Sequence, residues 1–188
     1  MKKTIFAVLM FAMLCVFSLS AQSQNRAGVI LNHYSPRTFA TGAIPRSDLE
    51  LIVQTGVRAP SAANRQPWHF TVVQNLDMAK RIVPQTVEGN VLIVISAAGD
   101  GSTNTREIID CALATQSIYL AAQALGYGSR IYTGPIDTFN RTLKNEVGLP
   151  RDHNAIAIVR VGRVEGNVDA TSAASPRKAA GDVVTYRQ

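Results

Sequence analysis

The segment from Thr105 to Leu125 has the pattern of a long helix that is apolar around most of its circumference. It is also rich in alanine. A helix of this kind is buried on several sides, and its small side chains let neighbouring elements pack closely against it. The sequence therefore predicts a long central helix with other elements arranged around it.

The segments on either side of this helix mix helical and extended patterns. Apolar residues recur at helical spacing after Ser47, which forms a capping box with Glu50, and this pattern stops at Pro60. Apolar and β-branched runs predict strands at Trp68–Gln74, Val91–Ala97 and Ala155–Val164, a short extended piece at Arg130–Thr133, and short helices at Asp77–Val83 and Phe139–Val147. The order lacks a regular strand–helix–strand repeat. It predicts an α+β fold in which helices surround a mixed, mostly antiparallel sheet.

The first residues have the features of a secretory signal. Lys2 and Lys3 precede an uncharged apolar run at 5–17, which is short for a bilayer span, and small residues lead up to Ala21. We therefore expect a signal peptide over residues 1–21, export to the periplasm, and a single domain over residues 22–188. A retained membrane anchor is the alternative.

The charge balance argues against nucleic acid as a partner. The formal net charge is +6, and it falls to +4 without Lys2 and Lys3. The basic residues are scattered, whereas nucleic-acid binding favours a basic patch with interleaved aromatic residues. A modest positive surplus suits a small anionic ligand instead.

No side chain has the setting of a catalytic residue. Ser61 lacks the glycines of a nucleophile elbow. Asp110 and Glu107 are interpreted as a solvated or paired helix edge rather than as an acid–base pair. Cys111 is the only cysteine after the signal, and it falls among apolar residues of the central helix. It is predicted to be a buried structural thiol.

Two patterns that resemble ligand-binding motifs are better explained without a ligand. Gly126 and Gly128 lack the third glycine of a dinucleotide fingerprint and follow a helix rather than a strand, so they are predicted to end the central helix. The three histidines show no ligand spacing and lie far apart in the sequence: His33, His69 and His153. We therefore expect no metal site.

The loop from Ala59 to Phe70 is the best candidate for a binding segment. It reads Ala-Pro-Ser-Ala-Ala-Asn-Arg-Gln-Pro-Trp-His-Phe. Its small residues allow close approach of the backbone to a ligand, its amides form hydrogen bonds, and it lies between two regular elements. Two polar clusters offer further groups for a phosphate: Ser35 with Arg37, and Arg177 with Lys178.

The loop resembles the signature of the FMN-dependent nitroreductase family. Other segments follow in that family's order. Ser35–Phe39 resembles the end of its N-terminal basic motif, Asp110–Ser129 its central helix, Val147–Pro150 with the strand Ala155–Val164 its late segment, and Pro176–Lys178 its tail motif before Val183–Tyr186. The match covers essentially the whole mature chain. It implies the nitroreductase-like fold, with a C-terminal arm that packs on a partner subunit.

The resemblance also implies a homodimer with FMN in two clefts between the subunits, no catalytic side chain and no metal. The implied cofactor contacts are His33, Tyr34, Ser35 and Arg37 near the N-terminus; Pro60, Ser61, Asn64 and Gln66 from the partner's loop; Thr133 and Gly134 at the ring edge; and Arg177 and Lys178 at the phosphate. His33 and Tyr34 stand where the family usually has basic residues. A neutral imidazole binds phosphate less strongly than a guanidinium, so FMN affinity is expected to be lowered or pH-dependent.

The implied activity is electron transfer through FMN, from NADH, NADPH or another donor to a small nitro- or quinone-type acceptor. Two alternatives stay open. One is an exported flavin-binding or electron-relay protein with little NAD(P)H turnover, because nicotinamide donors are scarce outside the cytoplasm. The other is a relative that fragments flavin or dehalogenates its substrate.

Overall fold

A four-stranded antiparallel sheet forms the centre of the fold, with its strands in the order β1-β2-β4-β3. The strands are Trp68–Val73 (β1), Val91–Ala98 (β2), Gly128–Tyr132 (β3) and His153–Gly162 (β4). The computed structural model describes residues 28–99, 105–165 and 177–187. Within these ranges the predicted strands are confirmed, and all three pairings are antiparallel.

The described residues fall into two compact units. Residues 28–33 belong to the first unit and contain a short helix at 28–32, while the second unit begins at Tyr34. The predicted signal peptide, residues 1–21, lies outside the described residues. No helix in the described part of the chain is both long enough and apolar enough to cross a membrane.

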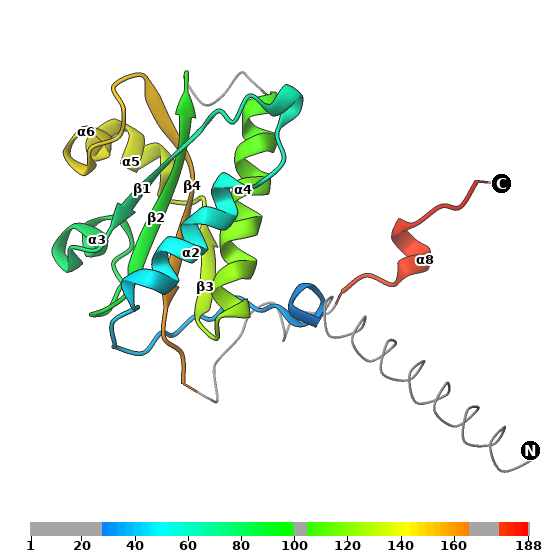
Figure 1. Cartoon of the computed structure of the whole chain (residues 1–188), viewed down its shortest axis with the longest axis horizontal. Helices are drawn as coiled ribbons and strands as arrows, with labels where there is room; N and C mark the ends of the chain where they lie inside the picture. Colours follow the sequence, from blue (N-terminus) through cyan, green and yellow to red (C-terminus); the bar gives the residue numbers. More distant parts are fainter. Residues whose placement is uncertain (1–27, 100–104, 166–176, 188) are drawn as a thin grey trace, which may run out of the picture. The chain divides into compact units, whose positions relative to one another are not determined.

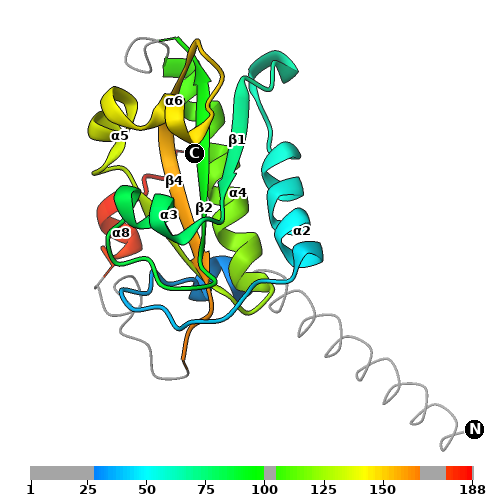
Figure 2. The same cartoon turned by 90° about the vertical axis from the view of Figure 1, so that its left-hand side faces the viewer.

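Helices cover both faces of the sheet (Figures 1 and 2). One face carries Arg46–Val57 (α2) and the long helix Thr105–Ala124 (α4). The other carries Leu76–Ile82 (α3), Ile136–Thr142 (α5) and Lys144–Val147 (α6). The predicted central helix is therefore confirmed to within one residue. The helix expected over Phe139–Val147 is in fact two short helices, because Leu143 leaves helical geometry between them.

Strand β2 is continuously apolar from Val91 to Ile95, and both of its faces are covered. Ile93 and Ile95 pack in the core on the α2–α4 side, while Leu92 and Val94 pack in the core on the α3–α5 side. All four are fully buried. Alternate side chains of a strand face opposite sides, so each core receives every second residue of this run. Burial of one such side chain contributes about 1.5–3 kcal/mol.

Helices α2 and α4 approach each other closely at Gly56. A Cβ atom built at Gly56 would lie 2.7 Å from Cδ1 of Ile118 and 3.1 Å from the Phe70 ring. A side chain larger than hydrogen does not fit there without displacing its neighbours. This close crossing fixes α2 against α4, and α2 leads directly into the candidate binding loop.

The predicted capping box at the start of α2 is wrong. Pro45 occupies the N-cap position, and no side chain caps the helix. The Ser47 hydroxyl contacts Asp48 rather than a free amide, and Glu50 accepts a hydrogen bond from Nε of Arg46 at 2.6 Å. Proline presets the backbone at a helix start, so the helix begins earlier than the Ser47–Glu50 pattern indicates.

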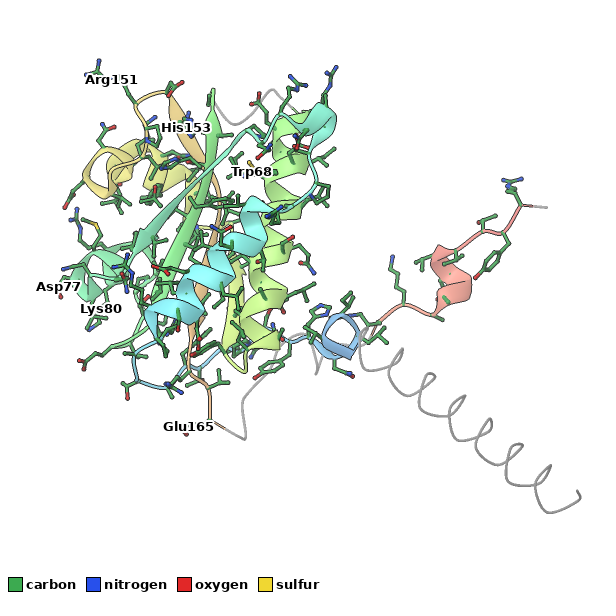
Figure 3. All side chains as sticks on the ribbon, in the orientation of Figure 1. Trp68, Asp77, Lys80, Arg151, His153 and Glu165 are labelled. Atoms are coloured by element: carbon green, nitrogen blue, oxygen red, sulfur yellow. The ribbon has the colours of Figure 1, made fainter. Side chains whose placement is uncertain are left out.

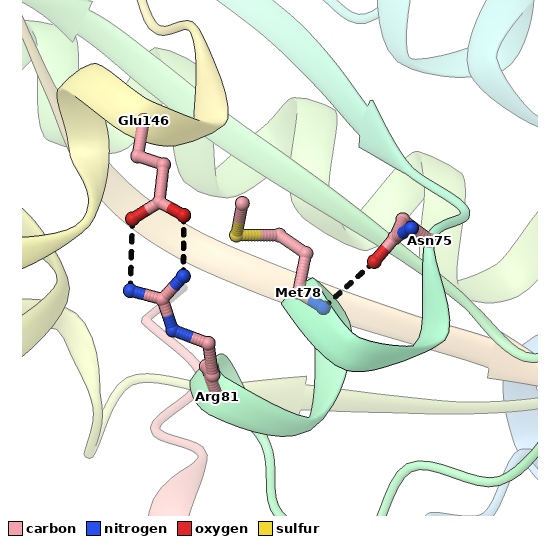
Figure 4. Close-up of polar contacts among 4 residues, drawn as sticks. All are labelled: Asn75, Met78, Arg81 and Glu146. Carbon is pink, nitrogen blue, oxygen red and sulfur yellow. Dashed lines mark hydrogen bonds and ion pairs between the residues drawn. The ribbon is translucent and has the colours of Figure 1, made fainter.

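On the opposite face, side-chain contacts hold the short helices (Figure 4). The amide of Asn75 caps α3 by accepting a hydrogen bond from the Met78 N–H at 2.9 Å. Arg81 and Glu146 form a two-pronged ion pair between α3 and α6, with Nη2 to Oε2 at 2.8 Å. The Arg81 guanidinium holds the pKa of the Glu146 carboxyl below its ordinary value.

Candidate functional site

The loop between α2 and β1 has an uncommon backbone. Ala63, Asn64 and Gln66 have φ values of 52°, 53° and 49°, in the left-handed region that non-glycine residues seldom adopt. Each such residue costs on the order of 1–3 kcal/mol, and the conformation persists only where its surroundings impose it. Residues 62–66 are also exposed. Strain that is concentrated in an exposed loop suggests that the conformation serves a ligand.

Hydrogen bonds hold this conformation in place. The Ala62 N–H donates to Oδ1 of Asp110 on α4 at 3.0 Å. The Gln66 N–H donates to the Ser61 hydroxyl oxygen at 3.0 Å, and the Gln66 amide donates to Oδ1 of Asn64 at 3.1 Å. Asp110 is buried, so its carboxylate is a fixed acceptor beneath the loop. The loop is thereby pre-organised on a rigid helix.

A second predicted cluster lies near the other end of α4. The Tyr34 N–H donates to Oε1 of Gln123 at 3.1 Å, and the Tyr34 carbonyl accepts from the Tyr119 hydroxyl at 2.7 Å and from Gln123 Nε2 at 2.8 Å. The Ser35 and Tyr119 hydroxyls are 3.2 Å apart. The backbone of Tyr34 is thus fixed on both sides. Arg37 follows two residues after Ser35 and is exposed.

The loop and the Tyr34–Ser35 segment are held at different places on α4. Figure 1 shows the α2–β1 connection beside the start of this helix and the segment that leads to α2 beside its end. Asp110 and Tyr119 are separated by about 14 Å along the helix axis and by about half a turn around it. One helix therefore organises both clusters but does not bring them to a common point within one chain.

The remaining predicted residues occupy three places. Thr133 and Gly134 follow directly after β3 and are exposed, and a Cβ atom built at Gly134 would meet no heavy atom within 4 Å. In the first unit, Nδ1 of His33 donates to the Ile30 carbonyl at 2.5 Å. Arg177 and Lys178 are exposed in the described segment 177–187, which includes the short helix Ala180–Val183 (α8). Their contact with a phosphate stays a prediction.

The structure also settles several interpretations of single residues. Cys111 is fully buried, as expected, and this burial raises the pKa of its thiol to about 12, with Asp110 and Glu107 adding to the effect. A thiol with that pKa is no nucleophile near neutral pH. Gly126 adopts a φ of 83°, and the Tyr127 N–H donates to the Ala122 carbonyl. That pair of features ends the helix, as predicted.

The sequence interpretation missed three side chains that hold the site: Asp110, Tyr119 and Gln123. Asp110 was expected at a solvated or paired helix edge; it is not solvated, because it is buried, and its partner is the Ala62 N–H of the loop. A signal was present in the sequence. A polar side chain on a helix that is buried on all sides needs a hydrogen-bond partner, and the backbone of a neighbouring loop is the nearest one.

The described residues contain no group of three or more His, Cys, Asp or Glu side chains that could hold a metal ion. They do bring two histidines together, since the ring centres of His69 and His153 lie 5.8 Å apart. The sequence separation of these residues concealed this contact.

Comparison with known proteins gives consistent results. The model of the Nitroreductase family matches residues 30–91 and 86–163, which is more than half of the chain. A protein of Archaeoglobus fulgidus described as "Putative NADH dehydrogenase/NAD(P)H nitroreductase" is 32% identical over 144 residues, covering 71% of this chain and 82% of that protein. A protein of Methanothermobacter thermautotrophicus with the same description is 26% identical over 137 residues, covering 68% of this chain and 71% of that protein.

Solved structures share the fold. A nitroreductase with bound FMN from Bacteroides fragilis superposes with a TM-score of 0.69 at 22% identity, covering 86% of this chain and 97% of that one. A BluB-like flavoprotein from Clostridium difficile superposes with a TM-score of 0.70 at 17% identity, covering 86% of this chain and 98% of that one.

Proposed function

The chain belongs to the nitroreductase family, and from that membership we propose that it is an FMN-dependent oxidoreductase. It would take electrons from NADH or NADPH and pass them to nitro- or quinone-type acceptors. The Archaeoglobus fulgidus relative is described as an NAD(P)H nitroreductase, and the Bacteroides fragilis structure contains FMN. The observation that carries the proposal is the exposed, left-handed loop, which the buried Asp110 holds in one conformation.

The donor groups suit the phosphate of FMN. Ser35 offers a hydroxyl whose position is set by Tyr119, and Arg37 offers an exposed guanidinium two residues later. Arg177 and Lys178 offer two more exposed cations. Cationic donors form strong, charge-assisted hydrogen bonds with phosphate oxygens. Tyr34 adds no positive charge to this cluster, whereas a basic residue at this position would.

The loop suits the flavin ring and the ribityl chain. Asn64 and Gln66 present amides, Ser61 presents a hydroxyl, and Pro60 introduces the loop. The open space at Gly134 lets a flat ligand approach the chain after β3 without meeting a side chain. Pre-organised amide donors around such a ligand fix its orientation at no further cost of ordering.

Bound FMN would supply the chemistry, accepting a hydride from the donor and passing electrons to the acceptor. The chain's own residues would bind and orient this group. The protonated Cys111 thiol agrees with a site in which no protein nucleophile takes part.

We place each site between two copies of the chain. The loop and the Tyr34–Ser35 segment are held half a turn apart on α4, so a second copy is the simplest source of the loop for each cofactor. Exposed apolar side chains on α2 and α4 offer a surface for the second copy: Leu51 at 53%, Ile109 at 53% and Leu113 at 41% exposure. The C-terminal arm also exposes apolar side chains, with Val183 at 60% and Tyr186 at 88% exposure.

We propose in addition that the protein works in the periplasm. The support is the signal-like pattern of residues 1–21. A chain exported unfolded would acquire FMN after export, and its electron donor there need not be a nicotinamide.

Anaerobic reduction tests the activity. The FMN-loaded protein is mixed with NADH or NADPH without oxygen, and the visible flavin band is followed before and after addition of a quinone or nitroaromatic compound. The proposal expects bleaching by the donor and recovery on adding the acceptor. A flavin that is retained but stays oxidised with both donors contradicts the NAD(P)H oxidoreductase and supports the relay alternative.

A further inference from the structure

His69 and His153 meet on the sheet face opposite to the core beneath α2 and α4. His69 on β1 pairs with Ser96 on β2, and His153 on β4 pairs with Ala98, two residues further along β2. Residues two apart on a strand share a face, so both imidazoles flank Ser96 from opposite sides. Their ring centres are 5.8 Å apart and the ring planes meet at 84°.

An irregularity in the sheet creates this meeting. The register between β2 and β4 shifts between Ile95 and Ser96, leaving Ile156 without a partner. Without this bulge Asn154 would stand opposite Ala98, and His153 would point to the other face. Bulges often re-aim a side chain next to a functional site. Figure 3 shows His153 near the end of the sheet at which Trp68 begins β1.

The hydrogen bonds at Ser96 select one form of His153. The Ser96 hydroxyl is 3.4 Å from the His69 carbonyl, to which it donates, and 3.2 Å from Nδ1 of His153. Both bonds form together only if Nδ1 of His153 carries the proton and donates to the Ser96 oxygen. Nε2 of His153 then has a free lone pair. A hydrogen bond that fixes the second ring nitrogen is typical of histidines that ligate metals.

The separation of the two rings fits a shared ion. Two imidazoles that bind one ion at metal–nitrogen distances of about 2.0–2.1 Å have ring centres about 4.5 Å apart at an N–metal–N angle of about 90° and about 6.4 Å apart at about 180°, and the observed separation lies between these limits. His69 is exposed, and its ring can turn about χ2, which has a broad energy minimum. The face is also open to water for the remaining coordination positions, because His153 is only half-buried.

The charged groups near the pair do not close the site. Lys144 Nζ is engaged by the His153 carbonyl at 3.3 Å and by Oδ1 of Asn154 at 2.9 Å. Arg151 and Asp152 precede His153 and are exposed. Among the described residues, Lys144, Arg151 and Asp152 together carry one net positive charge, so charge alone does not attract a cation to this pair. An ion must therefore bind through strong metal–nitrogen bonds rather than through charge.

We propose that His69 and His153 form a binding site for a late first-row divalent metal ion, with Cu²⁺ bound most tightly. Neutral imidazole is a preferred ligand of copper, nickel and zinc, and affinity rises toward Cu²⁺ in this series. Two protein ligands make an exchangeable site that ties β1 to β4 across β2. The site lies on the face away from α4 and is independent of the proposed flavin chemistry.

Calorimetric titration of the untagged, FMN-loaded protein with Cu²⁺ and Ni²⁺ tests the site. Nitrogen hyperfine splitting in the electron paramagnetic resonance spectrum of bound Cu²⁺ counts the imidazole ligands. The proposal expects one ion per chain with two imidazole nitrogens. His69→Gln and His153→Gln should each weaken Cu²⁺ binding at least tenfold. Ser96→Ala should weaken it by about tenfold, since it removes the group that orients His153.

Asp77→Asn, which changes an exposed side chain on α3 outside both proposed sites, is the control and should bind Cu²⁺ like the parent protein. FMN content and the midpoint of thermal unfolding verify that each variant is folded. Binding that is absent in the parent, or that persists unchanged in both the His69 and His153 variants, overturns the proposal. Neither result bears on FMN binding. A failure of the metal site is therefore distinguishable from a failure of the proposed function.

Discussion

Asp110 is the residue on which the candidate loop most depends. It is buried in the central helix, yet its carboxylate accepts a hydrogen bond from the exposed loop at Ala62. The sequence located the loop from its small and amide residues, but it did not identify the anchor. The anchor is distant in sequence and depends on how α2 crosses α4, which no local pattern reveals.

Replacing Asp110 by alanine should loosen the loop. Loss of the acceptor leaves the Ala62 N–H without its partner, at a cost of about 1–3 kcal/mol in unfolding free energy. FMN affinity should fall on the order of tenfold, which corresponds to about 1.4 kcal/mol. Equilibrium unfolding and FMN titration measure the two effects. Asp110→Asn keeps one acceptor oxygen and should recover most of the affinity; equal FMN affinity in all three proteins would contradict the anchoring role.

Cys111 should be inert in the folded protein. Its pKa is raised from 9.0 to about 12, so the folded thiol stays protonated while the unfolded thiol ionises near its ordinary value. The stability that this residue contributes is full below pH 9 and is lost as the pH rises toward 12. In protein that begins at residue 22, and so lacks Cys15, thiol titration at pH 8 should detect no reactive group until denaturant is added. Rapid modification of the native protein at that pH would show the thiol to be accessible.

At the scale of elements, the sequence predicted most helices and strands because each carries its own pattern. β2 is an apolar run and α4 is apolar all round, and both were located to within one residue. Predictions failed where elements meet. The capping box at Ser47 was overridden by Pro45, and the meeting of His69 with His153 depends on a bulge that no composition marks.

The crossing of α2 and α4 gives a prediction for Gly56. Gly56→Ala would gain about 1 kcal/mol in helix propensity. It would nevertheless place a methyl group 2.7 Å from Cδ1 of Ile118, and overpacking of this kind costs about 1–3 kcal/mol. We expect a net loss of stability in chemical denaturation. Gly56→Ala is also made in an Ile118→Val background, which lacks the Cδ1 methyl, and there it should cost less stability than it does beside Ile118. A Gly56→Ala protein that is more stable than the parent would refute the close crossing.

At the scale of the whole molecule, the proposed flavin site draws on two copies of the chain. One copy would supply the loop, and the other would supply the Tyr34–Ser35 segment. Family resemblance suggested this arrangement from the sequence. The positions of Asp110 and Tyr119 on different sides of α4 supply an independent physical reason for it.

The C-terminal cations give a prediction at this scale. Arg177→Ala and Lys178→Ala together should weaken FMN retention by tenfold or more, because each charge-assisted hydrogen bond to phosphate is worth about 1.5–3 kcal/mol. Riboflavin, which lacks the phosphate, should bind the parent and the variant equally. Lys80→Ala on α3 is the control for lost positive charge. FMN retention that matches the parent would remove these residues from the phosphate site.

Titration of the apoprotein with FMN tests whether the chain forms a flavin site. Flavin fluorescence reports binding, and gel filtration at the end point reports the assembly. We predict saturation at one FMN per chain, with the flavin eluting at the position of a dimer. An apoprotein that shows no saturable FMN binding would contradict the assignment of the loop, the Tyr34–Ser35 segment and the C-terminal arm to a flavin site.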